Sequence, residues 1–457
     1  MVEQFDIIVI GSGSGMLIAS VAVEQGLKVA LVESGRMGGT CINRGCVPSK
    51  MLIYPADVVA ILRDAKKIGV NAIVSQMDFQ GIMMRMHTVV DEDSNMQIQG
   101  VEQTPSLTWF KEMGEFVDDY TLQVGTHTIS AKKIYIVSGA RSAVPPIKGL
   151  ERVDYLTSDS VLQLREPPKS VIIVGGGYIG VEYGHFFAGM GIETTIIQRS
   201  PKLIPEEEPD VSDLLKLELE KRVKVYTNLE ALEVKQESNG VMLTTKDRVD
   251  RAVKEFRAER LMVATGRVSN ADILKPEKTG VQLDERGYIK VDDYLETSKK
   301  NIWAFGDAIG KAMFKHAANF EAIIVWHNSN HDHKVSMNYL TVPHGIFTYP
   351  QIASIGLKEA EAKAKHKILI GKIFYRDVAM GAAMGEPNGF VKVIVEQETG
   401  KILGAHIIGA EATVLIQEIV NAMASGKGTF EPIVQAMHIH PALSEVVQNA
   451  FGNLYPA

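Results

Sequence analysis

The sequence feature that most constrains the fold is a strand, a glycine-rich turn and a helix start that occur in this order twice. In the first copy, a strand that begins at Asp6 and continues through the apolar residues 7–10 precedes Gly11-Ser12-Gly13-Ser14-Gly15, and a second strand at 28–32 ends at Glu33. In the second copy, residues 171–174 precede Gly175-Gly176-Gly177-Tyr178-Ile179-Gly180, and a strand at 194–197 ends before Gln198. This order is that of a dinucleotide-binding βαβ unit. The sequence therefore predicts an α/β protein with two Rossmann-like domains.

Both turns have the composition that a dinucleotide pyrophosphate requires. The pyrophosphate is doubly anionic, so its site needs backbone amides at a helix N-terminus and glycines that let the backbone come close. The candidate glycines are Gly11, Gly13 and Gly15 in the first turn and Gly175, Gly177 and Gly180 in the second. Met16 replaces the third glycine of the first fingerprint, but Glu33 follows where a carboxylate can accept hydrogen bonds from ribose hydroxyl groups.

The second copy has Gln198 and Arg199 where such units often carry an acidic residue. A carboxylate would repel a 2′-phosphate, whereas Arg199 can pair with one. We therefore expect NADPH rather than NADH in this domain. The alternative is that Arg199 is a solvated surface arginine without a role in the choice of nucleotide.

Composition excludes several functions. The chain has 457 residues, of which 46% are hydrophobic and 23% charged, and a formal net charge of −7. This balance is that of a soluble globular protein, without the positive field that attracts nucleic acid or anionic membranes. The longest apolar runs, such as 7–10 and 171–174, have the length of strands and not of a membrane span. A strand begins near the N-terminus without a signal-peptide pattern, so we expect a cytoplasmic protein.

The order of predicted elements divides the chain into four segments. We expect the first dinucleotide domain at 1–150, the second at 151–269, a return to the first domain at 270–336, and a separate α+β domain at 337–457. In the last segment, strands at 391–395 and 402–408 alternate with amphipathic helices at 412–423 and 430–437.

The chain has two cysteines, Cys41 and Cys46, in the segment that follows the first dinucleotide motif. Residues five apart in a regular helix are separated by about 7.5 Å along the axis, beyond the roughly 7 Å that a disulfide spans between Cα atoms. The helix start must therefore be distorted, and Gly45 and Pro48 supply the means. A disulfide in such a turn is labile, and a thiolate there gains from the helix N-terminus and from Lys50. Zinc is a poor alternative because there is no second cysteine pair, and we expect no metal site.

The run from Gly38 through Cys41, Cys46, Val47-Pro48-Ser49 and Lys50 resembles that of the flavoprotein disulfide reductases, the family of dihydrolipoamide dehydrogenase, glutathione reductase, mercuric reductase and mycothione reductase. The resemblance extends over nearly the whole chain. It implies FAD in the first dinucleotide domain and a nicotinamide nucleotide in the second. It also implies that Cys41 attacks the substrate, that Cys46 stacks on the flavin and forms the charge-transfer complex, and that Lys50 near the flavin pairs with Glu182.

The same resemblance implies further contacts to the cofactors. Tyr178 would be the aromatic gate over the flavin that the nicotinamide displaces, and Asp307 in Ala304-Phe305-Gly306-Asp307 would hold the ribityl or pyrophosphate part of FAD. The other expected contacts are Gly39, Thr40, Lys50, Gly139 and Gly266.

Near the C-terminus, His440-Pro441-Ala442-Leu443-Ser444-Glu445 matches the H-P-x-x-x-E motif of this family. A histidine has a pKa near working pH, and a carboxylate fixes its tautomer and stabilises its charged form. The resemblance implies that His440 is the general acid/base for Cys41 and the substrate, oriented by Glu445. In this family the histidine comes from the partner subunit, so the expected assembly is a homodimer with a C-terminal dimerisation domain. His438 is the alternative that the sequence alone leaves open.

In detail the chain is most similar to mycothione reductase, which reduces a low-molecular-weight disulfide; the shared stretches include 264–272 and 315–322. Dihydrolipoamide dehydrogenase, which oxidises a dithiol with NAD, is the alternative. A flavin NAD(P)H oxidase and a non-catalytic FAD-binding subunit remain as lesser ones. The absence of a C-terminal cysteine pair disfavours mercuric reductase and the large thioredoxin reductases.

Overall fold

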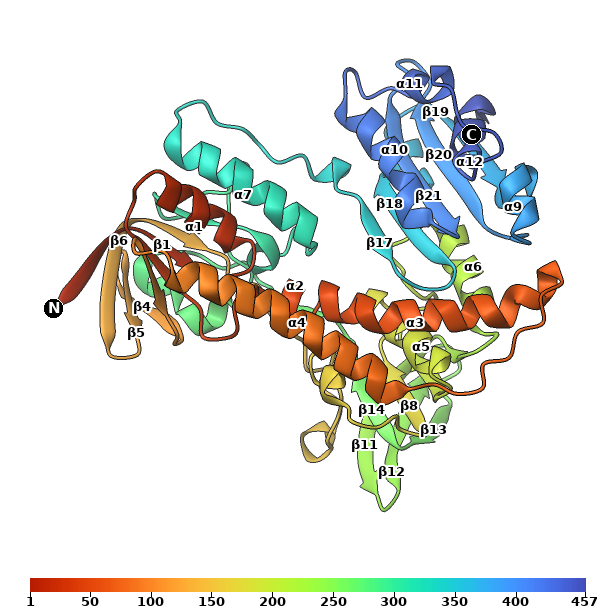
Figure 1. Cartoon of the computed structure of the whole chain (residues 1–457), viewed down its shortest axis with the longest axis horizontal. Coiled ribbons are helices and arrows are strands. Elements are labelled where there is room, and N and C mark those ends of the chain that lie inside the picture. Colours follow the sequence, from red (N-terminus) through yellow and green to blue (C-terminus); the bar gives the residue numbers. More distant parts are fainter. The chain divides into compact units, whose positions relative to one another are not determined.

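A computed structural model describes residues 1–457, which form two compact units built from alternating segments of the chain (Figure 1). The first unit comprises Met1–Met51, Met83–Ala143 and Gly266–Tyr339. The second unit comprises Leu52–Ile82, Val144–Thr265 and Leu340–Ala457. The chain therefore leaves the first unit and returns to it twice.

The first unit is built on a largely parallel sheet in the order β3-β2-β1-β6-β5-β4, with β16 paired to β6. Its strands are β1 (Val2–Ile10), β2 (Val29–Val32), β3 (Leu107–Phe110), β4 (Gly114–Asp118), β5 (Thr121–Val124), β6 (His127–Ile136) and β16 (Ile302–Ala304). Residues 7–10 of β1, residues 134–136 of β6, and all of β2 and β16 are apolar and buried, as is typical of parallel strands that are covered on both faces. Figure 1 shows α1 (Gly15–Glu24) and α7 (Lys315–Asn330) side by side, and the two helices are in contact.

Three further helices and a short ladder complete this part of the chain. The helices are α2 (Gly39–Asn43), α3 (Cys46–Asp64) and α4 (Phe79–Glu102); α3 and α4 continue into segments of the second unit. The ladder joins β7 (Ala140–Ser142) to β15 (Arg267–Ser269) in antiparallel orientation. The pairing of β16 with β6 places residues 302–304 in the sheet of the first unit.

The second unit contains the second dinucleotide motif. A parallel sheet has the order β10-β9-β8-β14, and a separate antiparallel sheet has the order β11-β12-β13. The strands are β8 (Ser170–Val174), β9 (Glu193–Ile197), β10 (Lys224–Tyr226), β11 (Leu229–Glu237), β12 (Gly240–Asp247), β13 (Val253–Ala258) and β14 (Arg260–Val263), with α5 (Tyr178–Gly189) and α6 (Pro209–Leu219).

The C-terminal part of the second unit is an α+β domain around a six-stranded antiparallel sheet in the order β17-β18-β21-β20-β19-β22. The strands are β17 (His344–Ile346), β18 (Gln351–Gly356), β19 (Ile368–Phe374), β20 (Phe390–Glu396), β21 (Ile402–Gly409) and β22 (Tyr455–Pro456). The helices are α8 (Glu359–Lys363), α9 (Ala379–Ala383), α10 (Ala412–Ala424), α11 (Glu431–Gln435) and α12 (Glu445–Gly452).

The two glycine turns are built alike. Gly11 has φ +108°, and a Cβ at this residue would lie 2.3 Å from the carbonyl oxygen of Val137. Gly175 has φ +113°, and its Cβ would lie 2.2 Å from the carbonyl oxygen of Ala264. In each copy the turn therefore packs against the backbone that follows the neighbouring parallel strand, and only glycine fits. The predicted fold class, two dinucleotide-binding folds and an α+β domain, is confirmed.

One helical stretch, residues 39–68, is long and apolar enough to span a membrane by length and composition alone. It is not one regular helix, because α2 ends at Asn43 and α3 begins at Cys46. Polar residues interrupt its apolar ones, so the stretch does not form a continuous apolar run in the sequence.

The second glycine turn gives a prediction about stability. A Cβ on Gly180 would lie 1.9 Å from the carbonyl oxygen of Gly175, so Gly180→Ala should lower the free energy of unfolding by about 1–3 kcal/mol through overpacking. Urea unfolding followed by circular dichroism measures this change. Gly177→Ala is the matched control, because a Cβ there meets nothing within 4 Å and the backbone is extended. Equal stability of the two variants would contradict the prediction.

Candidate active site

The two cysteines lie at a break between two helices of the first unit. α2 contains Cys41, and α3 begins at Cys46. Between them Arg44 has φ −145° and ψ 1°, outside the helical region, and a Cβ on Gly45 would lie 3.0 Å from the carbonyl oxygen of Thr40. The predicted distortion is therefore present at residues 44–45. Pro48 has no part in it, contrary to the expectation, because it occupies the first turn of α3, where its missing N–H group has no helical partner to lose.

The thiols of Cys41 and Cys46 are hydrogen-bonded to each other. The hydrogen bond from Cys41 lowers the pKa of Cys46 to about 6; burial opposes this shift, and the charge of Lys50, the N–H group at the helix start and the charge of Lys315 support it. The hydrogen bond to Cys46 and burial raise the pKa of Cys41. The negative charge of the reduced pair therefore resides on Cys46, and Cys41 keeps its proton.

The cysteine segment is fastened to the first glycine turn. The backbone N–H of Gly38 donates to Ser12 Oγ at 3.1 Å, and a Cβ on Gly39 would lie 2.7 Å from Cα of Gly13. Ser12 is itself held by Glu33, whose Oε2 accepts the backbone N–H of Ser12 at 3.0 Å and its hydroxyl at 2.9 Å. Glu33 thus ties the end of β2 to the turn, and Ser12 is a contact that sequence reasoning did not single out.

Lys315, the first residue of α7, is a second cation close to this segment. Its Nζ donates to Ser14 Oγ at 3.0 Å, and Ser14 Oγ donates to Asn319 Oδ1 at 2.9 Å. Burial lowers the pKa of Lys315, while the charges of Cys41 and Cys46 raise it. The sequence showed Lys315 only as part of a stretch shared with a family, because no motif places a lysine from α7 beside residues of the first turn.

The residues of the first unit fit a bound dinucleotide. A Cβ on Gly13, Gly139 or Gly266 would meet nothing within 4 Å, so the backbone at these residues borders open space. Gly13 precedes the N-terminus of α1, where free amides favour an anion. Asp307 pairs with Arg267 at 3.6 Å, and burial raises the pKa of Asp307. These are the groups expected to contact FAD.

The second glycine turn has a different polar residue behind it. Gln198 Oε1 accepts the backbone N–H groups of Gly176 at 3.1 Å and of Arg199 at 3.2 Å, and Gln198 Nε2 donates to the Lys202 carbonyl at 3.2 Å. Gln198 therefore occupies the place that Glu33 has in the first copy. Lys202 pairs with Asp213. The exposed Arg199 and Arg248, which donates to the Arg199 carbonyl at 3.4 Å, are left as cations beside this turn.

Tyr178 and Glu182 both lie on α5 of the second unit. The Tyr178 hydroxyl donates to Glu207 Oε1 at 2.9 Å, and the ring stacks on His344 with centroids 5.6 Å apart. Glu182, one turn further, accepts the backbone N–H of Phe347 at 2.9 Å. Lys50 belongs to the first unit, so its pairing with Glu182 stays a prediction.

The two C-terminal histidines have different surroundings. His440 Nδ1 lies 2.9 Å from Glu445 Oε1, Glu445 Oε2 accepts the backbone N–H of Ala442 at 3.1 Å, and the His440 side chain is 74% exposed. The hydrogen bond from His440 and that from Ala442 hold the pKa of Glu445 below its usual range. His438 is instead 7% exposed and paired with Glu418 at 2.7 Å. Geometry therefore favours His440, with Nε2 as the nitrogen available for proton transfer.

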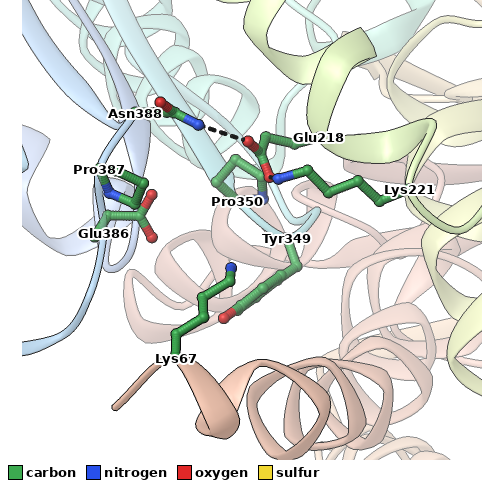
Figure 2. A pocket seen from close by; sticks show the side chains of 8 residues that line it. All are labelled: Lys67, Glu218, Lys221, Tyr349, Pro350, Glu386, Pro387 and Asn388. Carbon is green, nitrogen blue, oxygen red and sulfur yellow. Dashed lines mark hydrogen bonds and ion pairs between the residues drawn. The ribbon is translucent and has the colours of Figure 1, made fainter.

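A small cavity in the second unit is lined by none of these residues. Figure 2 shows its lining residues, among which Asn388 Nδ2 donates to Glu218 Oε1 at 3.0 Å. The cavity measures about 20 Å³, which is room for one water molecule. Its lining residues are Lys67, Glu218, Lys221, Tyr349, Pro350, Glu386, Pro387 and Asn388. None is a predicted site residue, and the cavity is too small for a substrate.

The sequence as a whole matches one family. Residues 5–322 match the family described as pyridine nucleotide-disulphide oxidoreductase, and residues 342–451 match the dimerisation domain of the same family. The chain belongs to the pyridine nucleotide-disulphide oxidoreductases, a family of FAD-dependent enzymes. The predicted family and enzyme class are thereby confirmed.

Individual relatives cover the chain from end to end. Mycothione reductase of Mycobacterium tuberculosis is 34% identical over 461 residues, which cover 98% of this chain and 99% of the relative. Dihydrolipoyl dehydrogenase of Chlamydia pneumoniae is 32% identical and covers 98% of this chain and 96% of the relative. The Cu(II) complex of the HOCl-induced flavoprotein disulfide reductase RclA from Escherichia coli has a TM-score of 0.88 at 27% identity, covering 98% of this chain and 99% of that one.

The lowered pKa of Cys46 predicts the pH dependence of its alkylation. A thiolate is present above its pKa, so the iodoacetamide reaction of Cys46 in the reduced protein should rise through about pH 6 and then level off. Lys50→Met should move this midpoint upward by about 1 pH unit, because an opposite charge is removed. Trypsin cleavage at Arg44 separates the two cysteine peptides for mass spectrometry. The control is Lys132→Met, an exposed lysine of β6; an equal shift in both variants would contradict the assignment.

Proposed function

We propose that this protein reduces a low-molecular-weight disulfide with electrons from NADPH, through FAD and the Cys41–Cys46 pair, as a mycothione-reductase-like enzyme. The observation that carries the proposal is the hydrogen-bonded cysteine pair with its charge on Cys46, fastened to the first glycine turn. The relative named mycothione reductase, aligned over 98% of this chain, supports the substrate class.

The cofactors are assigned to the two glycine turns. The first turn, Glu33, Asp307 and the open backbone at Gly139 and Gly266 would hold FAD, and the second turn with Arg199 would hold NADPH. When bound, FAD accepts a hydride from the nicotinamide and passes an electron pair to a disulfide. The chain itself places Cys46 and Lys50 together at the start of α3, and this arrangement keeps Cys46 ionised.

The thiol chemistry follows from the two different pKa values. Cys41 keeps its proton until a base removes it, and the His440–Glu445 pair is suited to do so. The Cys41 sulfur then attacks the substrate disulfide; a mixed disulfide forms, the substrate S–S bond breaks, and His440 returns the proton to the leaving thiolate. The Cys46 thiolate attacks the Cys41 sulfur, which releases the second thiolate of the substrate and re-forms the Cys41–Cys46 disulfide.

Dihydrolipoamide dehydrogenase activity is the second candidate. The same groups run in reverse oxidise a dithiol and yield NADH, and the relative named dihydrolipoyl dehydrogenase is 32% identical to this chain. The Gln198–Arg199 pair at the second turn, in place of a carboxylate, favours the NADPH-dependent reductase. A flavin NAD(P)H oxidase is the weakest alternative, because such enzymes typically use one redox cysteine.

A panel of substrates tests the proposal. Anaerobic kcat/KM values for mycothione, other small disulfides and lipoamide, each with NADPH and NADH, should be highest for a small disulfide with NADPH. Dihydrolipoamide with NAD is the reverse arm, and a higher kcat/KM there would replace the proposal by the second candidate. Fast consumption of NAD(P)H with oxygen as sole acceptor would favour the oxidase.

The exposed His440 leads to a proposal about assembly. The dimerisation domain of the family and the 74% exposure of His440 support a homodimer, in which His440 of one subunit serves Cys41 of the other. We further propose a cytoplasmic location, a compartment in which small thiols are kept reduced.

Subunit mixing tests this shared site. Cys41→Ser and His440→Gln homodimers should each be nearly inactive, because every site lacks one group. A hybrid dimer has one site with both lesions and one intact site, so random mixing should restore about a quarter of wild-type activity. Co-purification of untagged His440→Gln subunits with affinity-tagged Cys41→Ser subunits is the control for exchange of subunits, because it does not depend on where the active sites lie. If subunits exchange and activity does not return, His440 and Cys41 act within one chain.

A further inference from the structure

Glu207 is a buried carboxylate that the proposed reaction does not use. It lies between β9 and α6 in the run Glu206-Glu207-Glu208, and its side chain is 1% exposed. A buried carboxylate is costly unless hydrogen bonds and an opposite charge compensate its lost hydration. Its partners therefore indicate what the residue is for.

Both oxygens of Glu207 accept hydrogen bonds within the second unit. Oε2 accepts from Ser354 Oγ at 2.6 Å, and Oε1 accepts from the Tyr178 hydroxyl at 2.9 Å and from His344 Nε2. Burial alone would raise the pKa of Glu207, but the hydrogen bonds and the charge of His344 lower it to about 2. Glu207 is thus an anion at any working pH.

Tyr178 is held at its hydroxyl and on one face. The hydroxyl donates to Glu207, and the His344 ring stacks on the Tyr178 ring at an interplanar angle of 17°. His344 is the first residue of β17, and Ser354, on the neighbouring β18, is hydrogen-bonded to His406 at 3.1 Å. The groups that hold Tyr178 are therefore fixed by the antiparallel sheet of the C-terminal domain.

We propose that Glu207 and His344 form a latch that holds the Tyr178 ring in its resting position, so that a nicotinamide ring enters only when the Tyr178–Glu207 hydrogen bond breaks. The latch rests on the proposed role of Tyr178 as the aromatic gate. Glu207 and His344 act through Tyr178 and are positioning residues.

The latch weakens the binding of one class of ligand only. A hydrogen bond to an ionised acceptor is stronger than a neutral one, and a ligand that needs the open position binds more weakly by the fraction of molecules that are open. A nucleotide with a nicotinamide needs Tyr178 to move. A ligand that has only the adenosine and phosphate parts does not.

A purely structural Glu207 makes a different prediction. If it only anchors the loop before α6 to β18 through Ser354, its replacement lowers stability and leaves the relative affinities of the two ligand classes unchanged. The ratio of the Kd for a ligand with a nicotinamide to the Kd for a ligand without one therefore distinguishes a latch from a purely structural Glu207.

The experiment compares Kd values of the oxidised holoenzyme for NADP⁺ and for 2′-phospho-ADP-ribose, which lacks the nicotinamide, by isothermal titration calorimetry. Tyr178→Phe removes the hydroxyl and keeps the ring. We expect it to tighten NADP⁺ binding about tenfold and to leave 2′-phospho-ADP-ribose binding unchanged. Tyr183→Phe is the matched control, because it removes another buried hydroxyl of α5, which donates to the Ser158 carbonyl at 3.3 Å.

Glu207→Gln should shift the same ratio in the same direction, and the Tyr178→Phe/Glu207→Gln double variant should add little, because both remove one interaction. If Tyr178→Phe leaves the Kd ratio unchanged and Tyr178→Ala shifts it, the latch is wrong, and Tyr178 still acts as a gate. A ratio that neither Tyr178 variant changes would overturn the proposed role of Tyr178 itself. Tyr178→Phe also decides the question if Glu207→Gln fails to fold.

Discussion

The close approach of backbone to backbone at the two glycine turns is the constraint on which the other sites depend. Gly11 packs against the Val137 carbonyl and Gly175 against the Ala264 carbonyl, each at a distance that excludes any side chain. The helices α1 and α5 begin directly after these turns, and the N-terminus of a helix favours an anion. In the first unit, Gly38 and Gly39 contact the glycine turn and so hold the cysteine segment against it.

The distribution of charge around the cysteine pair follows from that placement. Cys46 begins a helix and lies near Lys50 and Lys315, whereas Cys41 lies on the preceding short helix and donates to it. The two thiols belong to the same residue type and yet differ in ionisation. The difference suits two successive roles, since the ionised sulfur can re-form the disulfide and the protonated one needs a base such as His440.

Much of the fold could be predicted from the sequence because its signals are local. The strand, glycine turn and helix of each dinucleotide unit are contiguous, and so are the glycine and the two cysteines that force the helix break. Pro48 shows the limit of prediction from local sequence. The effect of a proline depends on which helical turn it occupies, and only the structure places the start of α3 at Cys46. His438 and His440 show a second limit, because these neighbouring histidines differ only in their exposure and in the glutamate with which each is paired.

By itself, the sequence determined the family, the two dinucleotide folds and the positions of the two cysteines, because a short run of residues carries each of these signals. Only the tertiary structure decided which groups act on them from a distance. Lys315 reaches Ser14 across 301 residues, and His344 reaches Glu207 across 137. No local pattern encodes such contacts, because they arise when sheets and helices from separate segments pack and bring their side chains within hydrogen-bonding distance.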